Sequence, residues 1–229
     1  MNKKLIIMCL LLLVVVVIFI FIYISNKEQD GFIIESKMYL PEGLKNIHIN
    51  MLGRELRKLK PDLQYNDSDN SFHEKIFIDI YDSVYYSFDN REFIEYIMCG
   101  HNEPYFKKLK SVRLYTKMDE KDFQDNLSKI LKKYIKIYGE DFEARVRYAH
   151  MPKALIDIIW IKKTISIWLS YTIEISRNDK PSISLVICNK TESDFHKREI
   201  GWSVVCDSEH KKKYFTNVLS GIKYNLYGK

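Results

Sequence analysis

The sequence predicts an α+β protein in which a single N-terminal transmembrane helix precedes an antiparallel, meandering β-sheet domain covered by helices. Three observations predict it. Residues 5–24 form an unbroken apolar run, residues 164–177 alternate between apolar and polar side chains, and residues 119–139 carry an apolar stripe at helical spacing. Because helices and strands are segregated along the chain rather than strictly alternating, the domain is expected to be α+β.

Residues 5–24 have the length of a membrane-spanning helix. At 1.5 Å rise per residue, these 20 apolar residues extend about 30 Å, which is the hydrocarbon thickness of a bilayer. Lys3 and Lys4 precede the run and residues 26–30 after it are net negative, so the positive-inside rule places the N-terminus in the cytoplasm. The run is too long for a signal-peptide core and no small residues mark a cleavage site, which favours an uncleaved anchor over an atypical signal peptide.

The anchor divides the chain into three parts. Residues 1–4 are expected to be a short cytoplasmic tail, residues 5–25 a transmembrane signal anchor and residues 26–229 an extracytoplasmic α+β domain. The expected location is the inner (plasma) membrane of a bacterium, with the C-terminal domain in the periplasmic or extracytoplasmic space. The polar stretch 66–71 is expected to be a loop, because Asn, Asp and Ser side chains bond locally to the backbone, and it is a candidate boundary between two lobes.

The first expected helix of the domain covers residues 42–60. Its apolar side chains recur at helical spacing, and Pro41 and Pro61 suit its start and its end. Alternation then predicts a strand at 75–81, which continues or turns back through residues 84–88. The weaker expected elements are a short helix from Asp89 or Asn90 to Gly100, strands at 111–117, 143–149, 155–161, 183–187 and 202–206, and a terminal helix at 208–221.

The strongest helix and strand patterns lie in the second half of the chain. Asp119 is expected to cap a helix that Gly139 ends, with an apolar stripe on one side and lysines on the other. Residues 164–177 alternate with a period of two, which is typical of an antiparallel strand with one solvated face. Trp168 is the exception, because it lies on the polar face of this strand. The long helix is expected to cover the apolar face of the sheet.

No catalytic, cofactor-binding or metal-binding residues are predicted. The glycines are scattered singly, which argues against a phosphate-binding loop, and the histidines lack the spacing of a zinc site. Cys99, Gly100 and His101 form a local cluster of reactive types, but adjacent side chains rarely meet and Gly100 suits a helix end. Asp157 lies in an apolar strand, where it is either paired or on the solvent face, and the solvent face is favoured.

The exported cysteines allow one disulfide bond. Cys188 and Cys206 each end an expected strand, so a bridge between them is the candidate in an oxidising compartment. Cys99 remains outside this pair. A buried thiol is the alternative state for each of these cysteines.

The net charge of +6 does not by itself indicate a nucleic-acid partner. Lys, Ile, Asn and Tyr are abundant while Ala is scarce, which is the pattern of an AT-rich genome, and an exported domain meets little nucleic acid. The expected partners are therefore the lipid bilayer, through residues 5–24, and another protein. No nucleic acid and no small-molecule cofactor are expected.

The preferred hypothesis for function is protein binding by a membrane-anchored domain rather than enzyme catalysis. Trp168 and Trp202 are candidate partner contacts, because tryptophan is enriched at interface hot spots. One specific version is an immunity protein that neutralises an envelope-acting toxin. The alternatives are a structural or assembly subunit of a cell-envelope complex and an enzyme with an unfamiliar site.

Overall fold

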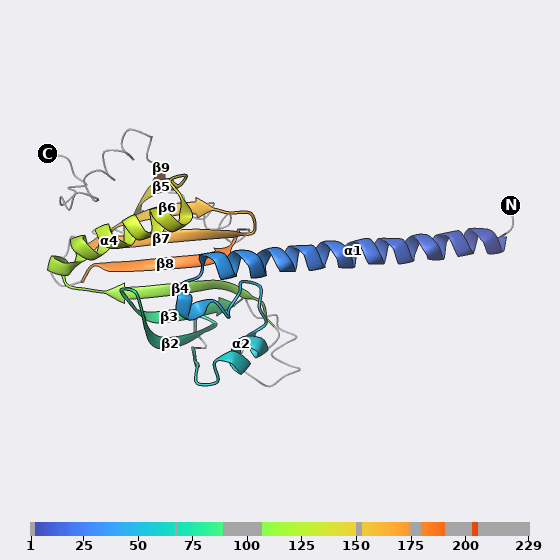
Figure 1. The fold of residues 1–229 in the computed structure, drawn as a ribbon, viewed down its shortest axis with the longest axis horizontal. Coiled ribbons are helices and arrows are strands. Elements are labelled where there is room, and N and C mark those ends of the chain that lie inside the picture. The colour runs from blue at the N-terminus through green and yellow to red at the C-terminus, as the bar shows by residue number, and fades with distance from the viewer. Residues whose placement is uncertain are drawn as a thin grey trace.

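The long N-terminal helix leads directly into a sheet covered by helices (Figure 1), which confirms the predicted α+β class. The computed structural model describes residues 3–66, 68–88, 107–149, 153–174, 180–190 and 203–205. Helix α1 (Lys3–Tyr39) has 37 residues, and its side chains at positions 10–24 are exposed. The helix is long and apolar enough to cross a membrane.

The chain after α1 forms two short helical pieces, so the prediction of a single helix at 42–60 is wrong. Helix η1 (Glu42–Leu44) is one 3-10 turn, and α2 (Gly53–Leu59) has seven residues. Asn50 lies between them with a φ of 75°, a left-handed conformation that interrupts a right-handed helix. Most apolar side chains of the predicted stripe are nevertheless buried. The spacing of these side chains therefore indicated burial rather than one continuous helix.

The described strands form a single nine-stranded sheet in which neighbouring strands are antiparallel. The order across the sheet is β1-β2-β3-β4-β8-β7-β6-β5-β9. The strands are β1 (Gln64–Asn66), β2 (Ser71–Ile78), β3 (Tyr81–Phe88), β4 (Leu109–Lys117), β5 (Glu143–Ala149), β6 (Lys153–Ile161), β7 (Ile165–Glu174), β8 (Ser182–Asn189) and β9 (Ser203–Val205).

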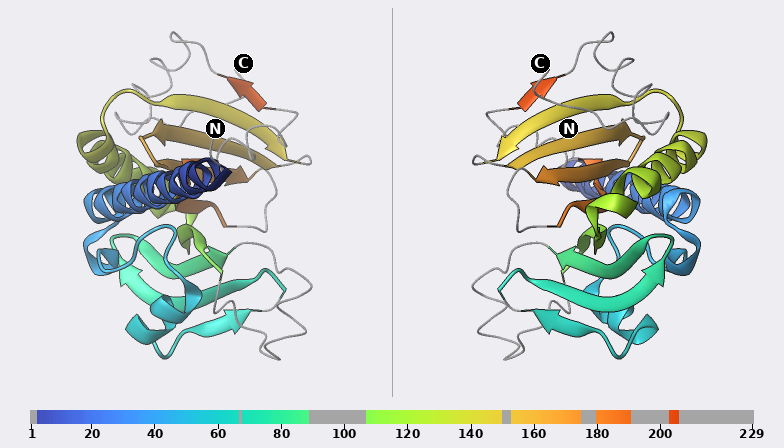
Figure 2. Two further views of the ribbon diagram at one scale, coloured as in Figure 1. Left: turned by 90° about the vertical axis from the view of Figure 1, so that its right-hand side faces the viewer. Right: turned by 90° about the vertical axis from the view of Figure 1, so that its left-hand side faces the viewer.

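Two meanders meet in the centre of this sheet. Strands β1 to β4 pair in sequence order, strands β5 to β8 do the same, and β4 pairs with β8 where the two halves join. Helix α4 (Glu120–Tyr138) connects β4 to β5 and lies on the same face of the sheet as the end of α1 (Figure 2). The polar stretch 66–71 is the turn between the paired strands β1 and β2, so it does not separate two lobes.

The chain turns back between β2 and β3, which is one of the two outcomes that the sequence allowed. Strand β2 ends at Ile78 and β3 begins at Tyr81, and these residues lie opposite each other. Asp79 in the turn has a φ of 55°, as tight hairpin turns require. The predicted strand at 75–81 is therefore too long, because the apolar alternation continues through the turn without marking it.

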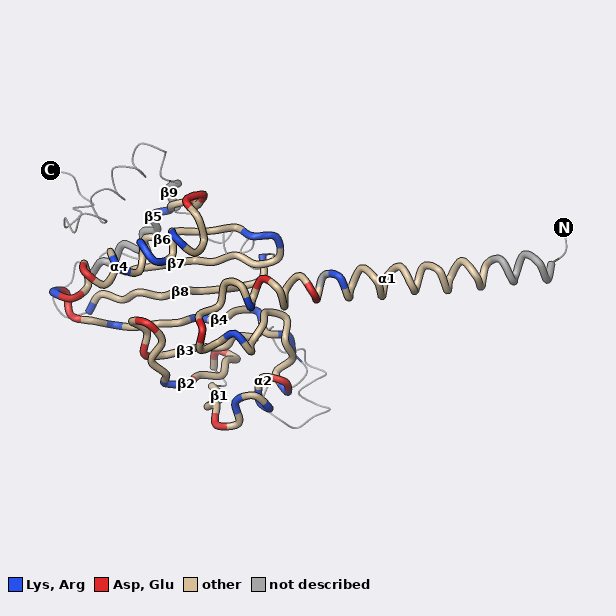
Figure 3. The backbone as a smooth tube through the Cα atoms, viewed as in Figure 1, with Lys and Arg blue, Asp and Glu red and all other residues tan. Residues whose placement is uncertain are grey.

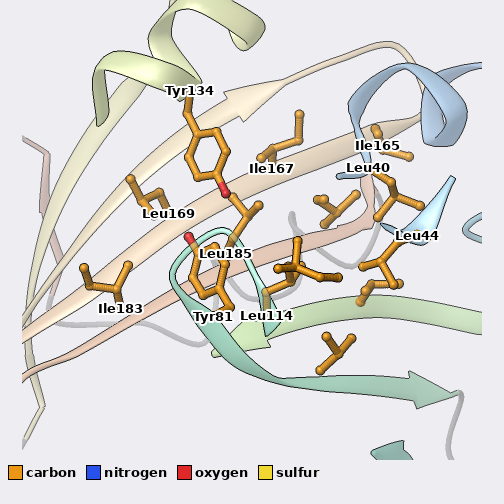
Figure 4. Packing of buried hydrophobic residues seen from close by; sticks show 14 of the residues in the cluster. Leu40, Leu44, Tyr81, Leu114, Tyr134, Ile165, Ile167, Leu169, Ile183 and Leu185 are labelled. Carbon is orange, nitrogen blue, oxygen red and sulfur yellow. The ribbon is translucent and has the colours of Figure 1, made fainter. Parts of the chain in front are cut away.

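The hydrophobic core lies between the sheet and the two helices. Figure 4 shows Ile167 of β7 and Leu185 of β8 in this core with Tyr134 of α4 and Leu40, which follows α1. The hydroxyl groups of Tyr81 and Tyr134 point toward each other there (Figure 4). Burial raises the pKa of both tyrosines, so both remain neutral phenols at physiological pH.

The elements expected after residue 107 are confirmed where the structure describes them. Strands β4 to β9 overlap the expected strands at 111–117, 143–149, 155–161, 164–177, 183–187 and 202–206, and α4 begins after Asp119 and ends before Gly139. Asp119 occupies the N-cap position, but its Oδ1 pairs with Lys180 Nζ at 3.0 Å and makes no side-chain hydrogen bond to the helix. The short helix predicted to end at Gly100 and the terminal helix predicted at 208–221 lie outside the described residues.

The conformation of Gly139 gives a test of this fold. Its φ of 92° and ψ of 171° are essentially restricted to glycine, and nothing lies within 4 Å of the place a Cβ would take. We expect Gly139→Ala to lower the free energy of unfolding by about 1–3 kcal/mol through backbone strain alone. Urea denaturation of the full chain in detergent measures this. Glu140→Ala, at the exposed next residue, is the control, and equal stabilities of the two variants would contradict the assignment.

Candidate functional site

Three side chains, two on α1 and one directly after it, attach this helix to the domain. Phe32, Ser36 and Leu40 recur every four residues and are 2%, 0% and 3% exposed, whereas the side chains at 10–24 are between 47% and 76% exposed. A spacing of four keeps side chains on one helix face. The apolar part of α1 therefore continues without a linker into a segment that is packed in the core of the domain.

The carboxylate of Glu35 fixes α1 to the turn between β6 and β7. Its Oε1 accepts a hydrogen bond from the Lys163 N–H at 3.0 Å, and its Oε2 accepts from the Thr164 N–H at 2.8 Å, Thr164 Oγ1 at 2.7 Å and the Ile165 N–H at 3.1 Å. Partial burial acts to raise the pKa of Glu35, but these hydrogen bonds outweigh it and hold the pKa below its ordinary value of 4.5. Glu35 lies on α1 beyond the apolar run, where the helix meets the sheet.

Two further hydrogen bonds join α1 to segments far away in the sequence. The Ile49 N–H donates to Ser36 Oγ at 3.0 Å in a buried position. The Tyr138 hydroxyl, at the end of α4, donates to the Tyr39 carbonyl at 3.0 Å. Helix α1 is therefore held by the β6–β7 turn, by the segment before α2 and by α4, so the orientation of the domain follows that of the helix.

A groove of about 540 Å³ lies beside this attached end of α1. Its lining includes Met38 of α1, Phe77 near the β2–β3 turn and Ile137 of α4, which are 65%, 89% and 45% exposed. Lys133 and Asp79 also line it, and Lys133 Nζ contacts Asp79 Oδ1 at 2.5 Å. Exposed apolar side chains from three separate elements therefore gather around one concave surface, which we call the α1 groove.

A second hollow, of about 590 Å³, lies between α2 and β2. Lys60 Nζ is 2.6 Å from Glu74 Oε1, and the Tyr86 hydroxyl donates to the same oxygen. Burial, together with this contact to Glu74, raises the pKa of Tyr86, so its hydroxyl remains a donor. The three groups satisfy one another, which favours a stabilising ion pair over a ligand site.

Asp157 is fully buried, so the expectation that it lies on a solvent face is wrong. Ser170 Oγ donates to Asp157 Oδ1 at 2.6 Å, and the two residues are opposite each other on β6 and β7. Asp157 is 0% exposed and Ser170 is 9% exposed. The alternative that this carboxylate is paired is confirmed, because the hydrogen bond from Ser170 gives it a partner where water does not reach it.

Trp168 is also buried, although the sequence placed it on the polar face of its strand and made it a candidate partner contact. It is 5% exposed and packs in a small cluster with Ile159 and Cys188. The Cys188 sulfur lies 3.4 Å from Ser166 Oγ. Trp168 therefore serves packing in this structure, and a role in partner binding stays a prediction.

The other candidate residues lie outside the described part of the chain. They are Trp202, the second predicted partner contact, Cys206, the predicted disulfide partner of Cys188, and the Cys99-Gly100-His101 cluster. These residues therefore remain predictions from the sequence. Within the described residues, no three His, Cys, Asp or Glu side chains gather into a group that could hold a metal ion.

Reasoning from the sequence missed the residues that the tertiary structure brings to the α1 groove. Phe77 gave one usable signal, because it is an aromatic residue on the face of its strand opposite to Ile76 and Ile78. Met38 and Ile137 gave no such signal, since Met38 lies beyond the apolar run and Ile137 is not part of the apolar stripe of its helix. Glu35 gave none either, because its hydrogen-bond partners are about 130 residues away in the sequence.

The fold and the groove define a class: an α+β domain continuous with an N-terminal helix that is long and apolar enough to cross a membrane. Comparison of the chain with known protein families, with curated proteins and with solved structures finds no match. The function is therefore inferred from the residues of this chain.

The hydrogen bonds of Glu35 predict a pH-dependent stability. Because folding lowers the pKa of Glu35, its stabilisation is fully present above its ordinary pKa of 4.5 and is lost as the pH falls through the folded value. We expect Glu35→Gln to lower the free energy of unfolding at pH 7 by about 1 kcal/mol, a figure reduced for partial exposure. The difference from the wild type should shrink on acidification.

Urea denaturation at a series of pH values measures this difference. Glu42→Gln is the matched control, because Glu42 is an exposed carboxylate paired only at the surface with Lys45. A Glu35→Gln variant with the same stability as wild type at pH 7, or a difference that grows on acidification, would show that the contact does not stabilise the junction.

Proposed function

We propose that this chain is a single-pass membrane protein whose domain binds another protein through the α1 groove. The observation that carries the proposal is the convergence of Met38, Phe77 and Ile137, exposed from three different elements, around one hollow. Large exposed apolar side chains are costly in water, and their clustering marks interaction sites. A partner that covers them gains the free energy of removing this surface from water.

The shape and charge of the groove favour a partner of a particular chemistry. Phe77 projects at 89% exposure, so it suits an apolar pocket on the other protein. Lys133 and Asp79 in the lining favour a partner with polar groups around its apolar contact. The occupant we propose is therefore a protein surface with an apolar centre and a polar rim.

The orientation of the anchor decides which proteins the domain meets. Lys3 and Lys4 before the apolar run and the net negative segment after it support a cytoplasmic N-terminus and an extracytoplasmic domain. In that orientation the partner is a component of the cell envelope or a protein that enters it. An immunity protein against an envelope-acting toxin is one specific form of this proposal, and a subunit of an envelope complex is the other.

The groove is tested with a photo-crosslinking amino acid at Phe77 in cells that produce the full chain. We expect a specific adduct from this position and none from Leu59, which is 50% exposed on α2 away from the groove. With the purified partner, Phe77→Asp should weaken binding about tenfold or more, because a charge replaces a buried aromatic anchor. Leu59→Asp should bind as wild type does.

Two outcomes would contradict the proposal. One is the absence of any adduct at Phe77, and the other is equal binding by Phe77→Asp and the wild type. An adduct with a second copy of this chain would replace the proposed partner by self-association. Thermal unfolding of both variants checks that a loss of binding does not reflect a loss of folding.

The orientation is tested by alkaline phosphatase fused after the C-terminal end of the chain. This enzyme requires disulfides that form outside the cytoplasm, so we expect the fusion to be active. Changing Lys3 and Lys4 to Glu while adding lysines after Asn26 should reduce the activity, because it reverses the charge difference across the anchor. An inactive wild-type fusion, at normal levels of the protein, would reverse the proposed orientation.

A further inference from the structure

The end of the domain from which the anchor emerges carries exposed lysines that come from distant parts of the sequence. Lys27 lies on α1 itself. Lys163 belongs to the β6–β7 turn that binds Glu35, and the Lys190 N–H donates to the Thr164 carbonyl of the same turn at 3.0 Å. Lys108 pairs with Leu52 in the segment next to α1. Figure 3 shows basic residues at this end of the domain, around the exit of α1. We call Lys27, Lys108, Lys163 and Lys190 the juxtamembrane lysines.

The contacts of α1 place these lysines at a defined height above the apolar run. Asn50 Nδ2 donates to Gln29 Oε1 at 3.3 Å, so the segment of Lys108 lies at the level of Gln29. A Cβ at Gly31 would lie 3.0 Å from Thr164 Cγ2, so the β6–β7 turn lies at the level of Gly31. At 1.5 Å per residue, Gln29 and Gly31 are about 8 and 10 Å along the axis beyond Ile24.

This height lies at the outer edge of the head-group layer of a bilayer. The polar layers add roughly 5–8 Å on each side of the hydrocarbon core, and a lysine side chain reaches several ångströms beyond its own backbone. An extended lysine side chain at this level therefore reaches to within about one Debye length, 8 Å at physiological salt, of the lipid phosphates.

Acidic groups share this end of the domain with the lysines, and two of them are held by hydrogen bonds within the domain. The carboxylate of Glu35 is bound to the β6–β7 turn, and that of Glu55 accepts a hydrogen bond from the Leu52 N–H at 3.0 Å. Asp30 is exposed beside Lys27, and Glu28 precedes it in the sequence. The segment directly after the apolar run is thus net negative on its own, and the fold adds Lys108, Lys163 and Lys190 around it.

We propose that the juxtamembrane lysines bind the anionic phospholipid head groups of the bilayer that α1 crosses. Cations at the surface of an anionic membrane are attracted to it, and the attraction falls within a Debye length. Because α1 joins the domain without a linker, all four lysines reach the surface together when the helix stands near the membrane normal. The interaction holds the domain upright on the membrane. It rests on the membrane anchor and is independent of the α1 groove.

The test uses the full chain reconstituted into phosphatidylcholine vesicles that contain traces of spin-labelled lipid. Electron paramagnetic resonance measures the fraction of labelled lipid that the protein immobilises, for phosphatidylglycerol and for phosphatidylcholine separately. We expect the wild type to prefer phosphatidylglycerol by about twofold or more at low salt, and the preference to weaken at high salt, where the Debye length falls to about 3 Å.

Replacing the four juxtamembrane lysines by glutamine should remove most of this preference. The matched control replaces Lys121, Lys129, Lys132 and Lys136, which are exposed on α4. The last residue of helix α4, Tyr138, meets α1 at Tyr39, which is about 22 Å beyond Ile24. The rest of α4 extends from this contact in the direction away from the anchor (Figure 1), so its lysines lie too far from the lipid to bind it. Lys3 and Lys4 contribute the same background to both variants.

The two variants distinguish the proposal from its alternatives. Equal lipid preference in the juxtamembrane and α4 variants would overturn it, and so would a wild-type preference that is unchanged by salt. Thermal unfolding of each variant shows whether the domain is folded. If the quadruple variant unfolds, Lys163→Gln and Lys190→Gln are measured singly, and a preference equal to that of wild type in both would overturn the proposal. Loss of the lipid preference without any change in crosslinking at Phe77 separates this result from the test of the groove.

Discussion

The binding of the Glu35 carboxylate by the β6–β7 turn determines how helix α1 meets the domain. Two backbone N–H groups and the Thr164 hydroxyl converge on one of its oxygens, and a third N–H bonds the other. The absence of a side chain at Gly31 lets the turn approach α1 closely. With the turn in place, Phe32 and Ser36 are buried and the helix has no free segment before the sheet. A change in the tilt of α1 is therefore transmitted directly to the domain.

The juxtamembrane lysines and the α1 groove lie at different distances along helix α1. The proposed lipid-binding lysines lie near the level of Gln29 to Gly31, whereas Met38 of the α1 groove is about 21 Å beyond Ile24 by helical rise. In the proposed membrane arrangement the groove is outside the head-group layer and accessible to a partner in the aqueous space. A partner anchored in the same membrane must itself extend by roughly this distance to reach Phe77.

The second face of the sheet shows why alternation alone did not predict exposure. Asp157, Ser170 and Trp168 lie on the face opposite the helices, where the polar pattern of β7 suggested solvent. They are 0%, 9% and 5% exposed. Asp157 and Ser170 satisfy each other by a hydrogen bond, and Trp168 packs on Ile159 and Cys188. The alternation along a strand thus shows only that its two faces differ in polarity. A polar face can be buried where its polar groups form hydrogen bonds.

The apolar run of α1, helix α4 and the strands of the second meander could be predicted from the sequence, because each signal is carried by neighbouring residues. Prediction from the sequence failed for residues 42–60, where the apolar spacing suits both a helix and an irregular buried segment. Only the tertiary structure decided the pairing of β4 with β8, the attachment of α1 and the assembly of the α1 groove. The physical reason is sequence separation. The contact of Glu35 with Thr164 spans 129 residues, and no local pattern in either segment encodes the position of the other.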